Sequence, residues 1–152
     1  MCLEYSTAGG KFLVGTENGT VIACNRKAKN PSDRIGTVYE GQWKDDVKHG
    51  KGLMRYASGN AYDGEWKEDK REGRGTRRFP DGAEYTGEWR AGEMKGRGTM
   101  RFSDGHVYEG EYRADEKEGR GTYRFSYGDV YEGEFRENLE SHMFSAKASL
   151  SF

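Results

Sequence analysis

The chain has 152 residues, a formal net charge of -1 at pH 7, and nearly equal shares of hydrophobic (33%) and charged (34%) residues. This composition excludes a thick two-layer core, and the balanced charge argues against nucleic acid as a partner of the chain. Polarity alone would favour disorder, but three Trp, ten Tyr, seven Phe and 23 Gly recur at regular intervals, which disordered segments seldom show.

The first predicted elements are two short strands in KFLVGTENGTVIACN, residues 11–25, on either side of Asn18-Gly19, a strong hairpin signal. FLVGTENGTVIACNRKAKNP resembles part of a WD-repeat blade over about residues 8–35, most closely that of axonemal dynein intermediate chains. One hairpin cannot close a propeller. We therefore expect residues 1–36 to form a hairpin and a basic linker, which either caps the next segment or hangs free.

The join near Gly36 has two explanations, a genuine fusion or a chimeric gene model. A genuine fusion favours a cilium or flagellum as the site of the protein.

A 23-residue repeat organises the chain from Tyr39 onward. Its first motif reads YEGQW, YDGEW, YTGEW, YEGEY and YEGEF, beginning at Tyr39, Tyr62, Tyr85, Tyr108 and Tyr131. In four units a GxG pair, an aromatic residue and a further glycine follow. Repeats of this length indicate stacked units that bury surface against their neighbours. Four full units and half of a fifth are expected over residues 37–137.

Each unit has the pattern of a β-hairpin. Tyr62, Gly64 and Trp66 alternate with charged residues, which places aromatic and glycine residues on one face of the strand. Pro80 and Gly82 suit the second and last positions of a type I turn. The predicted fold is all-β: an elongated single-layer antiparallel sheet of stacked 23-residue hairpins, preceded by a short N-terminal hairpin.

The repeated columns, YxGxW followed by GxG, an aromatic residue and glycine, resemble the MORN repeat over about residues 36–137. The resemblance implies a scaffold or binding module. MORN arrays occur in cytoskeletal, ciliary and membrane-junction proteins, and as accessory segments of lipid kinases and a lysine methyltransferase. Nothing in this sequence resembles either catalytic domain, so no such activity is implied.

The aromatic face is the first candidate binding surface. A single layer leaves this face uncovered, and exposed apolar patches usually mark interaction sites. A partner helix, an extended peptide or a second copy of the chain would lie along it; the alternative is that the rings mainly pack on one another. The candidate partner-binding residues are Tyr39, Trp43, Tyr62, Trp66, Phe79, Tyr85, Trp89, Phe102, Tyr108, Tyr112, Phe125 and Tyr131.

Arginine columns on the other face have two explanations. Pairing with glutamates of adjoining strands would neutralise them within the sheet, whereas binding of acidic phospholipid would give them a function. Acidic residues outnumber basic ones across the repeats, so internal pairing is favoured. The candidate lipid-binding residues under the second explanation are Arg74, Arg78, Arg97, Arg101, Arg120 and Arg124.

No catalytic, metal or cofactor site is predicted. No Ser/His/Asp or Cys/His set is evident, and the GxG pairs lie inside strands rather than at a strand-to-helix turn. Cys2 and Cys24 form no disulfide framework, and neither a signal peptide nor a membrane span is predicted, so a cytoplasmic location is expected. The repeat pattern fails after Phe135, and residues 138–152 are predicted to form a cap or a tail.

The favoured function is a non-enzymatic protein-interaction scaffold, in a ciliary, flagellar or cytoskeletal assembly. The alternatives are a peripheral membrane-binding module, or an accessory fragment of a larger protein of the lipid-kinase type.

Overall fold

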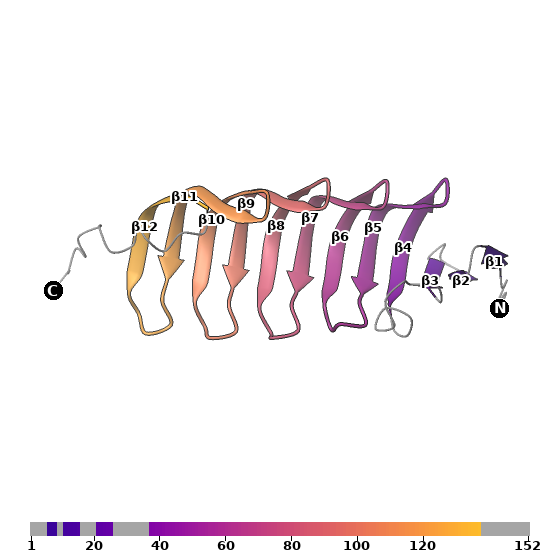
Figure 1. The fold of residues 1–152 in the computed structure, drawn as a ribbon, viewed down its shortest axis with the longest axis horizontal. Helices are drawn as coiled ribbons and strands as arrows, with labels where there is room; N and C mark the ends of the chain where they lie inside the picture. The colour runs from indigo at the N-terminus through magenta and orange to yellow at the C-terminus, as the bar shows by residue number, and fades with distance from the viewer. Residues whose placement is uncertain (1–5, 9–10, 16–20, 26–36, 138–152) are drawn as a thin grey trace.

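The computed structural model describes residues 6–8, 11–15, 21–25 and 37–137 (Figure 1). These residues form twelve strands in one antiparallel sheet, in which each strand pairs with its neighbours in sequence. The predicted all-β, single-layer architecture is confirmed. The strands are β1 (Ser6–Ala8), β2 (Lys11–Gly15), β3 (Val21–Asn25), β4 (Val38–Lys44), β5 (Val47–Arg55), β6 (Ala61–Lys67), β7 (Lys70–Arg78), β8 (Glu84–Arg90), β9 (Glu93–Arg101), β10 (Val107–Arg113), β11 (Glu116–Arg124) and β12 (Val130–Phe135).

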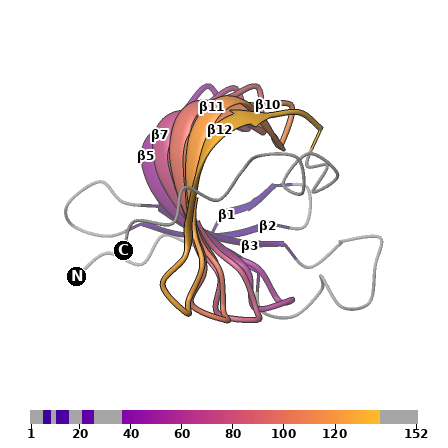
Figure 2. The ribbon, with the colours of Figure 1, turned by 90° about the vertical axis from the view of Figure 1, so that its left-hand side faces the viewer.

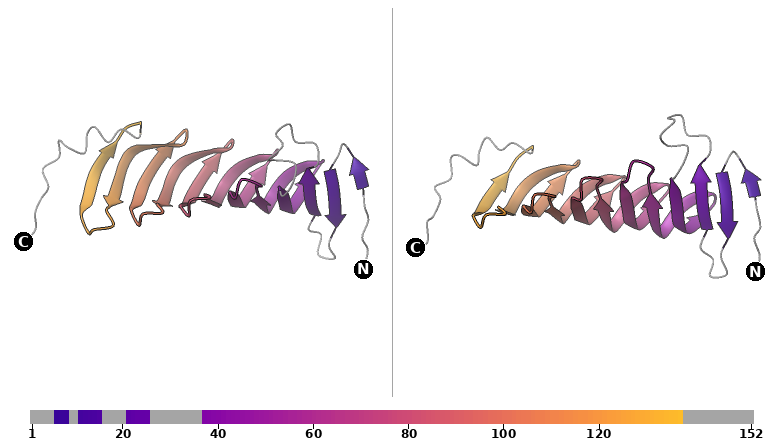
Figure 3. Two further views of the ribbon diagram at one scale, coloured as in Figure 1. Left: turned by 60° about the horizontal axis from the view of Figure 1, so that its bottom comes forward. Right: turned by 90° about the horizontal axis from the view of Figure 1, so that it is seen from below.

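The repeat strands follow one another along the long axis of the molecule (Figure 1). Seen end-on, each strand is bent into an arch, and the arches of successive repeats lie behind one another (Figure 2). The views from below show one layer of strands, with no second sheet or helix over the described residues (Figure 3). The repeats therefore bury side chains within a single layer.

The N-terminal strands continue the repeat sheet. β2 pairs with β3, as predicted, and β3 pairs with β4, where Val21 faces Gly41. The predicted hairpin thus lies against the first repeat, although its Asn18-Gly19 turn falls outside the described residues. β1 is an additional strand that the sequence pattern does not predict.

Every complete repeat hairpin contains one register shift. In β6 and β7, Gly64 faces Gly75, but Trp66 faces Arg71, so β7 contributes two extra residues between these pairs. Gly73 lies among them with a φ of 67°, a left-handed conformation that glycine adopts without steric cost. Bulges bend and twist the strand that carries them, which accounts for the arch.

The turns differ at the two ends of the strands. At the tight turn after β6 both central residues, Glu68 and Asp69, have positive φ (48° and 66°), as a type I′ turn requires. Aspartate is among the residue types that tolerate a left-handed backbone, whereas glutamate is not. At the opposite end the amide of Gly82 donates to the carbonyl of Phe79 at 3.0 Å, which confirms the turn with Pro80 in second position.

The core is a layer of rings that lie over glycine backbone. The side chain of Tyr62 crosses the glycines of its hairpin: a Cβ atom on Gly75 would lie 2.3 Å from the Tyr62 hydroxyl oxygen. That hydroxyl donates to the carbonyl of Glu65 at 3.0 Å. The glycine of GxG is therefore required because the tyrosine ring occupies the space of a side chain.

Candidate interaction surfaces

Ten rings form a continuous aromatic ladder on one face. The first tyrosine of each of the four complete repeats contacts a ring of its own repeat and a ring of the next repeat. Tyr62 lies 5.1 Å from Trp66 and 5.2 Å from Trp89 between ring centroids, with the planes nearly perpendicular, the favoured edge-to-face geometry. In order along the sheet, the ladder consists of Trp43, Tyr39, Trp66, Tyr62, Trp89, Tyr85, Tyr112, Tyr108, Phe135 and Tyr131.

Polar atoms of the ladder bond to backbone of the preceding repeat. The indole nitrogen of Trp66 donates to the carbonyl of Gly52 at 3.0 Å, and that of Trp89 donates to Gly75 at 3.1 Å. Tyr112 replaces tryptophan in the next repeat, and its buried hydroxyl has no hydrogen-bond partner. Burial also raises the pKa of Tyr112. The ladder therefore contains one unsatisfied polar group.

Long side chains of the second strands lie over the ladder rings. The guanidinium of Arg71 lies 4.4 Å from the centroid of Trp89, and the ammonium of Lys48 lies 5.4 Å from that of Trp66. Lys48 also pairs with Asp69 at 2.8 Å. Met94 occupies the same column and is buried. These side chains close the ladder from solvent and add cation–π attraction.

The ladder lies in the core. Seven of the twelve predicted partner-binding residues are buried: Tyr39, Tyr62, Trp66, Tyr85, Trp89, Tyr108 and Tyr112. These rings cannot form the exposed stripe that the sequence suggested, because they pack on one another and under the long side chains. The other five are only partly buried: Trp43, Phe79, Phe102, Phe125 and Tyr131.

A second row of apolar side chains runs along the margin of the same face. We call it the outer row, and it consists of Met54, Tyr56, Phe79, Met100, Phe102, Tyr123, Phe125 and Tyr127. Seven members are partly buried, whereas Tyr127 is 70% exposed. Tyr127 stacks on Phe125 with 5.2 Å between ring centroids. The outer row is the accessible apolar part of this face.

Sequence reasoning identified only part of the outer row. Met54, Met100 and Tyr123 lie two positions before an aromatic residue of the row, and hence on the same face of the strand, so strand alternation was a usable signal. Tyr127 lies in the last described turn of this type, where no strand periodicity marks it.

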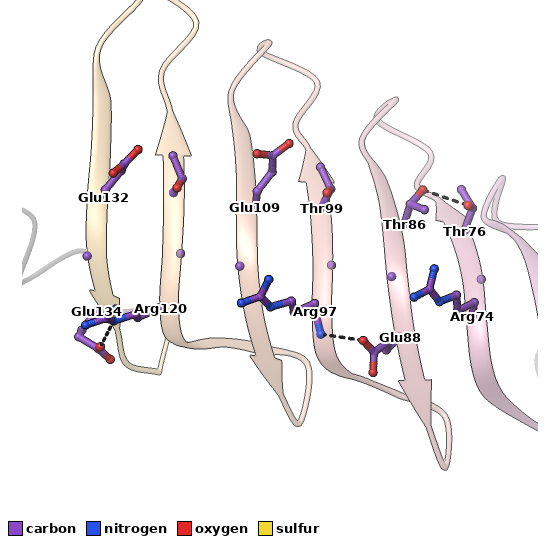
Figure 4. Close-up of a pocket in the computed structure, with 17 residues that line it drawn as sticks. Arg74, Thr76, Thr86, Glu88, Arg97, Thr99, Glu109, Arg120, Glu132 and Glu134 are labelled. Atoms are coloured by element: carbon purple, nitrogen blue, oxygen red, sulfur yellow. Dashed lines mark hydrogen bonds and ion pairs between the residues drawn. The ribbon is translucent and has the colours of Figure 1, made fainter.

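The opposite face carries a polar trough of about 990 Å³ that spans β7 to β12 (Figure 4). Its floor is the backbone of the glycine columns. One wall consists of Thr76, Thr86, Thr99, Glu109, Thr122 and Glu132, and the other of Arg74, Glu88, Arg97, Arg120 and Glu134.

Half of the predicted lipid-binding arginines are paired within the sheet. Arg78 pairs with Glu84 at 2.9 Å, and Arg124 pairs with Glu109 at 2.7 Å. Arg120 lies 3.4 Å from Glu134. Among the described residues, ion pairs are absent from the remaining three of this set, namely Arg74, Arg97 and Arg101.

Glutamates beside the register shift accept hydrogen bonds from backbone amides. The carboxylate of Glu65 accepts from the amide of Arg74 at 3.2 Å, and that of Glu88 accepts from the amide of Arg97 at 3.4 Å. Glu65 and Glu88 thus depart from the explanation in which glutamates of adjoining strands pair with arginine side chains. The bulge exposes backbone amides, and these carboxylates satisfy them.

Metal-ligating clusters and membrane-spanning helices are absent from the described part of the chain. That part holds no group of three or more His, Cys, Asp or Glu side chains that could bind a metal ion. Within the same residues, no helix is long and apolar enough to cross a membrane.

Comparison with known proteins shows two kinds of similarity. The family model described as MORN repeat matches residues 39–61, 62–84, 85–107, 108–130 and 131–141. A shorter stretch is similar to dynein intermediate chains: the 70 kDa intermediate chain of the flagellar outer arm of Chlamydomonas reinhardtii is 56% identical over 43 residues, which are 27% of this chain and 8% of that protein. The dynein axonemal intermediate chain 2 of Rattus norvegicus is 56% identical over 40 residues, which are 26% of this chain and 6% of that protein.

The chain thus spans less than a tenth of the length of these curated relatives. Among solved structures, the TCP domain of Drosophila melanogaster SAS-4, in complex with a proline-rich motif of Ana2, aligns with a TM-score of 0.36 and 14% identity. That alignment covers 84% of this chain and 81% of the SAS-4 chain.

Proposed function

The chain belongs to the MORN-repeat family, and from this premise we propose that it is a non-enzymatic scaffold that binds a partner protein along its outer row. One observation carries the proposal: a row of apolar side chains borders an open single-layer sheet, and no second layer covers it in the described residues. Apolar rows of this kind usually mark interaction surfaces.

The chemistry of the outer row suggests its partner. Methionine and aromatic side chains offer an adaptable apolar surface. The Arg77 guanidinium lies 4.4 Å from the centroid of Phe79 and provides a charge beside the row. A helix or extended peptide with an apolar face and acidic flanks fits this surface. A second copy of the chain is the alternative occupant.

The likeness to axonemal dynein intermediate chains supports a place in a cilium or flagellum. A fluorescently tagged chain, expressed in ciliated cells, should enrich along the axoneme and remain there after membranes are removed with detergent. A diffuse cytoplasmic signal that detergent extracts would contradict this location.

Site-specific crosslinking tests the outer row. A photoreactive amino acid in place of Tyr127 should crosslink to an axonemal protein. The same photoreactive amino acid in place of Thr99, which lies in the trough, should not. Equal crosslinking from both positions would contradict the proposal. Light scattering on the purified chain in low and high salt then identifies the occupant, because a salt-resistant dimer whose copies crosslink through position 127 indicates self-association.

Lipid binding is the second candidate function, favoured by two arginines of the trough, Arg74 and Arg97, that make no ion pair with a described residue. Reversal of both charges should abolish binding to vesicles that contain a phosphoinositide, and high salt should weaken the binding of the unmodified chain. Absence of vesicle binding at low salt would exclude this function.

A further inference from the structure

The last described strand, β12, pairs with β11 on one side, and no described strand lies on its other side. Three features join the two strands of earlier hairpins, the glycine contact in all four and the other two in some of them, and β12 carries the first-strand residue of each. They concern Glu132, Gly133 and Glu134, which occupy the first-strand positions of the fifth repeat. Each feature requires a particular residue on a following strand.

Glu132 belongs to a column in which two of the four earlier members, both glutamates, form ion pairs. In the first hairpin Glu40 pairs with Arg55 of the second strand at 3.1 Å, and in the fourth hairpin Glu109 pairs with Arg124 at 2.7 Å. Glu132 is the next member of this column, and it makes no ion pair with any described residue. A basic residue on an added strand would complete the pair.

Glu134 belongs to the column whose side chains accept hydrogen bonds from backbone amides at the bulge. Gln42, Glu65 and Glu88 each accept from an amide of the second strand of their own hairpin, at 2.9, 3.2 and 3.4 Å. On β12 the corresponding carboxylate lies beside Arg120 of the preceding hairpin instead. An added strand would offer it an amide of the usual kind.

Gly133 requires glycine opposite it. The ring of Tyr131 crosses Gly133 as Tyr108 crosses Gly110, and a Cβ atom on Gly121, which faces Gly110, would lie 2.6 Å from the Tyr108 ring. An added strand with a side chain at the corresponding position would collide with Tyr131. The edge of β12 therefore favours an added strand that has glycine opposite Gly133.

The chain's own sequence beyond β12 does not meet these requirements. A shift of 23 residues places Glu140, His142, Met143 and Phe144 in the columns of Lys117, Gly119, Arg120 and Gly121. Phenylalanine would replace the required glycine, and glutamate would replace the lysine that lies 5.4 Å from the centroid of the Tyr108 ring. At these columns the sequence therefore lacks the lysine and the glycine that β11 carries.

We propose that the edge of β12 opposite β11, where no described strand lies, binds an extended, basic, glycine-containing strand of another protein, with the pattern Lys-x-Gly-Arg-Gly-Thr-x-Arg seen in β11. Edge strands offer unpaired backbone groups, and strand addition to such an edge is an established mode of peptide recognition. The glutamates of β12 select a basic strand, and Tyr131 selects glycine.

A synthetic peptide tests the proposal on the full-length chain. The peptide EKEGRGTYR has the sequence of residues 116–124, and its binding can be followed by calorimetry at low and moderate salt. Saturable binding with one site per chain is expected. A matched peptide, EKEGRFTYR, carries Phe at the position of Gly121 and should not bind. Equal affinity for the two peptides, or no binding of either, would overturn the proposal.

Charge exchange then locates the site. Glu132→Arg should weaken binding of EKEGRGTYR at least tenfold, and the peptide EKEGRGTYE, with Glu in last position, should recover most of the loss on this variant. Glu132 is exposed, so the substitution leaves the core intact. Unchanged affinity of the variant would place the peptide elsewhere and overturn the proposal.

The edge is independent of the outer row. Tyr127→Ser should leave peptide affinity unchanged, so failure of one proposal is distinguishable from failure of the other. If the chain forms a dimer in light scattering, the peptide should dissociate a dimer built through β12. A stable β12 dimer that excludes the peptide would assign the edge to a second copy and overturn the proposed heterologous partner.

Discussion

The two faces of this sheet share one backbone but differ in how their side chains are used. On the aromatic face, the rings of Tyr62, Tyr85 and Tyr108 have no exposed area and each contacts two neighbouring rings. On the polar face, the side chains of the Arg78–Glu84 pair remain 59% and 34% exposed.

The two faces differ in how much their side chains contribute to the stability of the fold. Buried, nearly perpendicular ring contacts contribute beyond the area they bury, whereas exposed ion pairs contribute about 0–1 kcal/mol each. The aromatic face therefore holds the repeats together, while the polar face can change its charges at little cost in stability. Five experiments test this contrast, from the largest expected effect to the smallest.

Alkaline pH should remove the stability of the aromatic face. Burial raises the pKa of Tyr39 and of Tyr108 from the ordinary 10.0 to about 12. Below pH 10 these phenols are protonated in both states, and between pH 10 and about 12 they ionise only in the unfolded chain, so the free energy of unfolding falls as pH rises. Circular dichroism and tyrosinate absorbance, measured together, should change in one transition; full ionisation of a still-folded sheet would contradict the burial.

Trp66→Ala should lower the free energy of unfolding by about 3–5 kcal/mol, the usual cost of deleting a large buried ring. The substitution removes contacts to Tyr39 and Tyr62 and the hydrogen bond to Gly52. Urea denaturation measures the loss. Trp43→Ala is the matched control, with a smaller expected loss because Trp43 is only partly buried; equal losses would contradict the ladder.

Gly75→Ala should cost about 1–3 kcal/mol, typical of overpacking. The added methyl group would lie 2.3 Å from the Tyr62 hydroxyl oxygen. A double-mutant cycle with Tyr62→Ala measures the coupling. If the ring causes the strain, Gly75→Ala should cost much less once Tyr62 is absent, whereas an unchanged cost would assign the effect to the backbone.

Tyr112→Phe should raise the free energy of unfolding by about 1 kcal/mol, because it removes a buried hydroxyl without a partner. Tyr108→Phe is the matched control and should lower stability by a similar amount, since its hydroxyl donates to the carbonyl of Glu111 at 3.1 Å. Effects of the same sign in both variants would show that hydrogen bonding does not explain the difference.

Arg78→Ala should change the free energy of unfolding by less than about 1 kcal/mol, with the effect reduced in high salt. Arg97→Ala serves as the comparison, because Arg97 makes no ion pair within the described part of the chain. A loss of several kcal/mol for Arg78→Ala would show that the polar face also stabilises the fold.

The sequence predicted the sheet because the same periodicity appears at every column. Tyr62, Gly64 and Trp66 alternate cleanly, and Pro80 with Gly82 specifies a turn, so hairpins, faces and repeat boundaries follow from local pattern. The register shift does not follow, because the two extra residues between Gly75 and Arg71 leave strand alternation intact on each side.

The surfaces were less predictable for the same reason. Without the shift, Glu65 is expected to face an arginine, whereas the bulge directs its carboxylate to a backbone amide. The exposure of each ring depends on its neighbour in space. Tyr62 and Phe79 look equally apolar in sequence, but only Tyr62 lies between two other rings.

The ladder also bears on how such a chain can grow. In the four complete repeats, the first tyrosine contacts one ring of its own repeat and one ring of the next, so the contact between neighbouring repeats is the same at each junction. Tyr62 and Tyr85 occupy the same position in successive repeats, so a chain joined from one of these positions to the other keeps the same ring contacts. Recombination between repeats can therefore delete or duplicate a 23-residue unit without leaving an unmatched ring, and each event changes the span of the sheet by two strand spacings, about 9.6 Å. The length of the sheet can therefore change in fixed steps of one repeat.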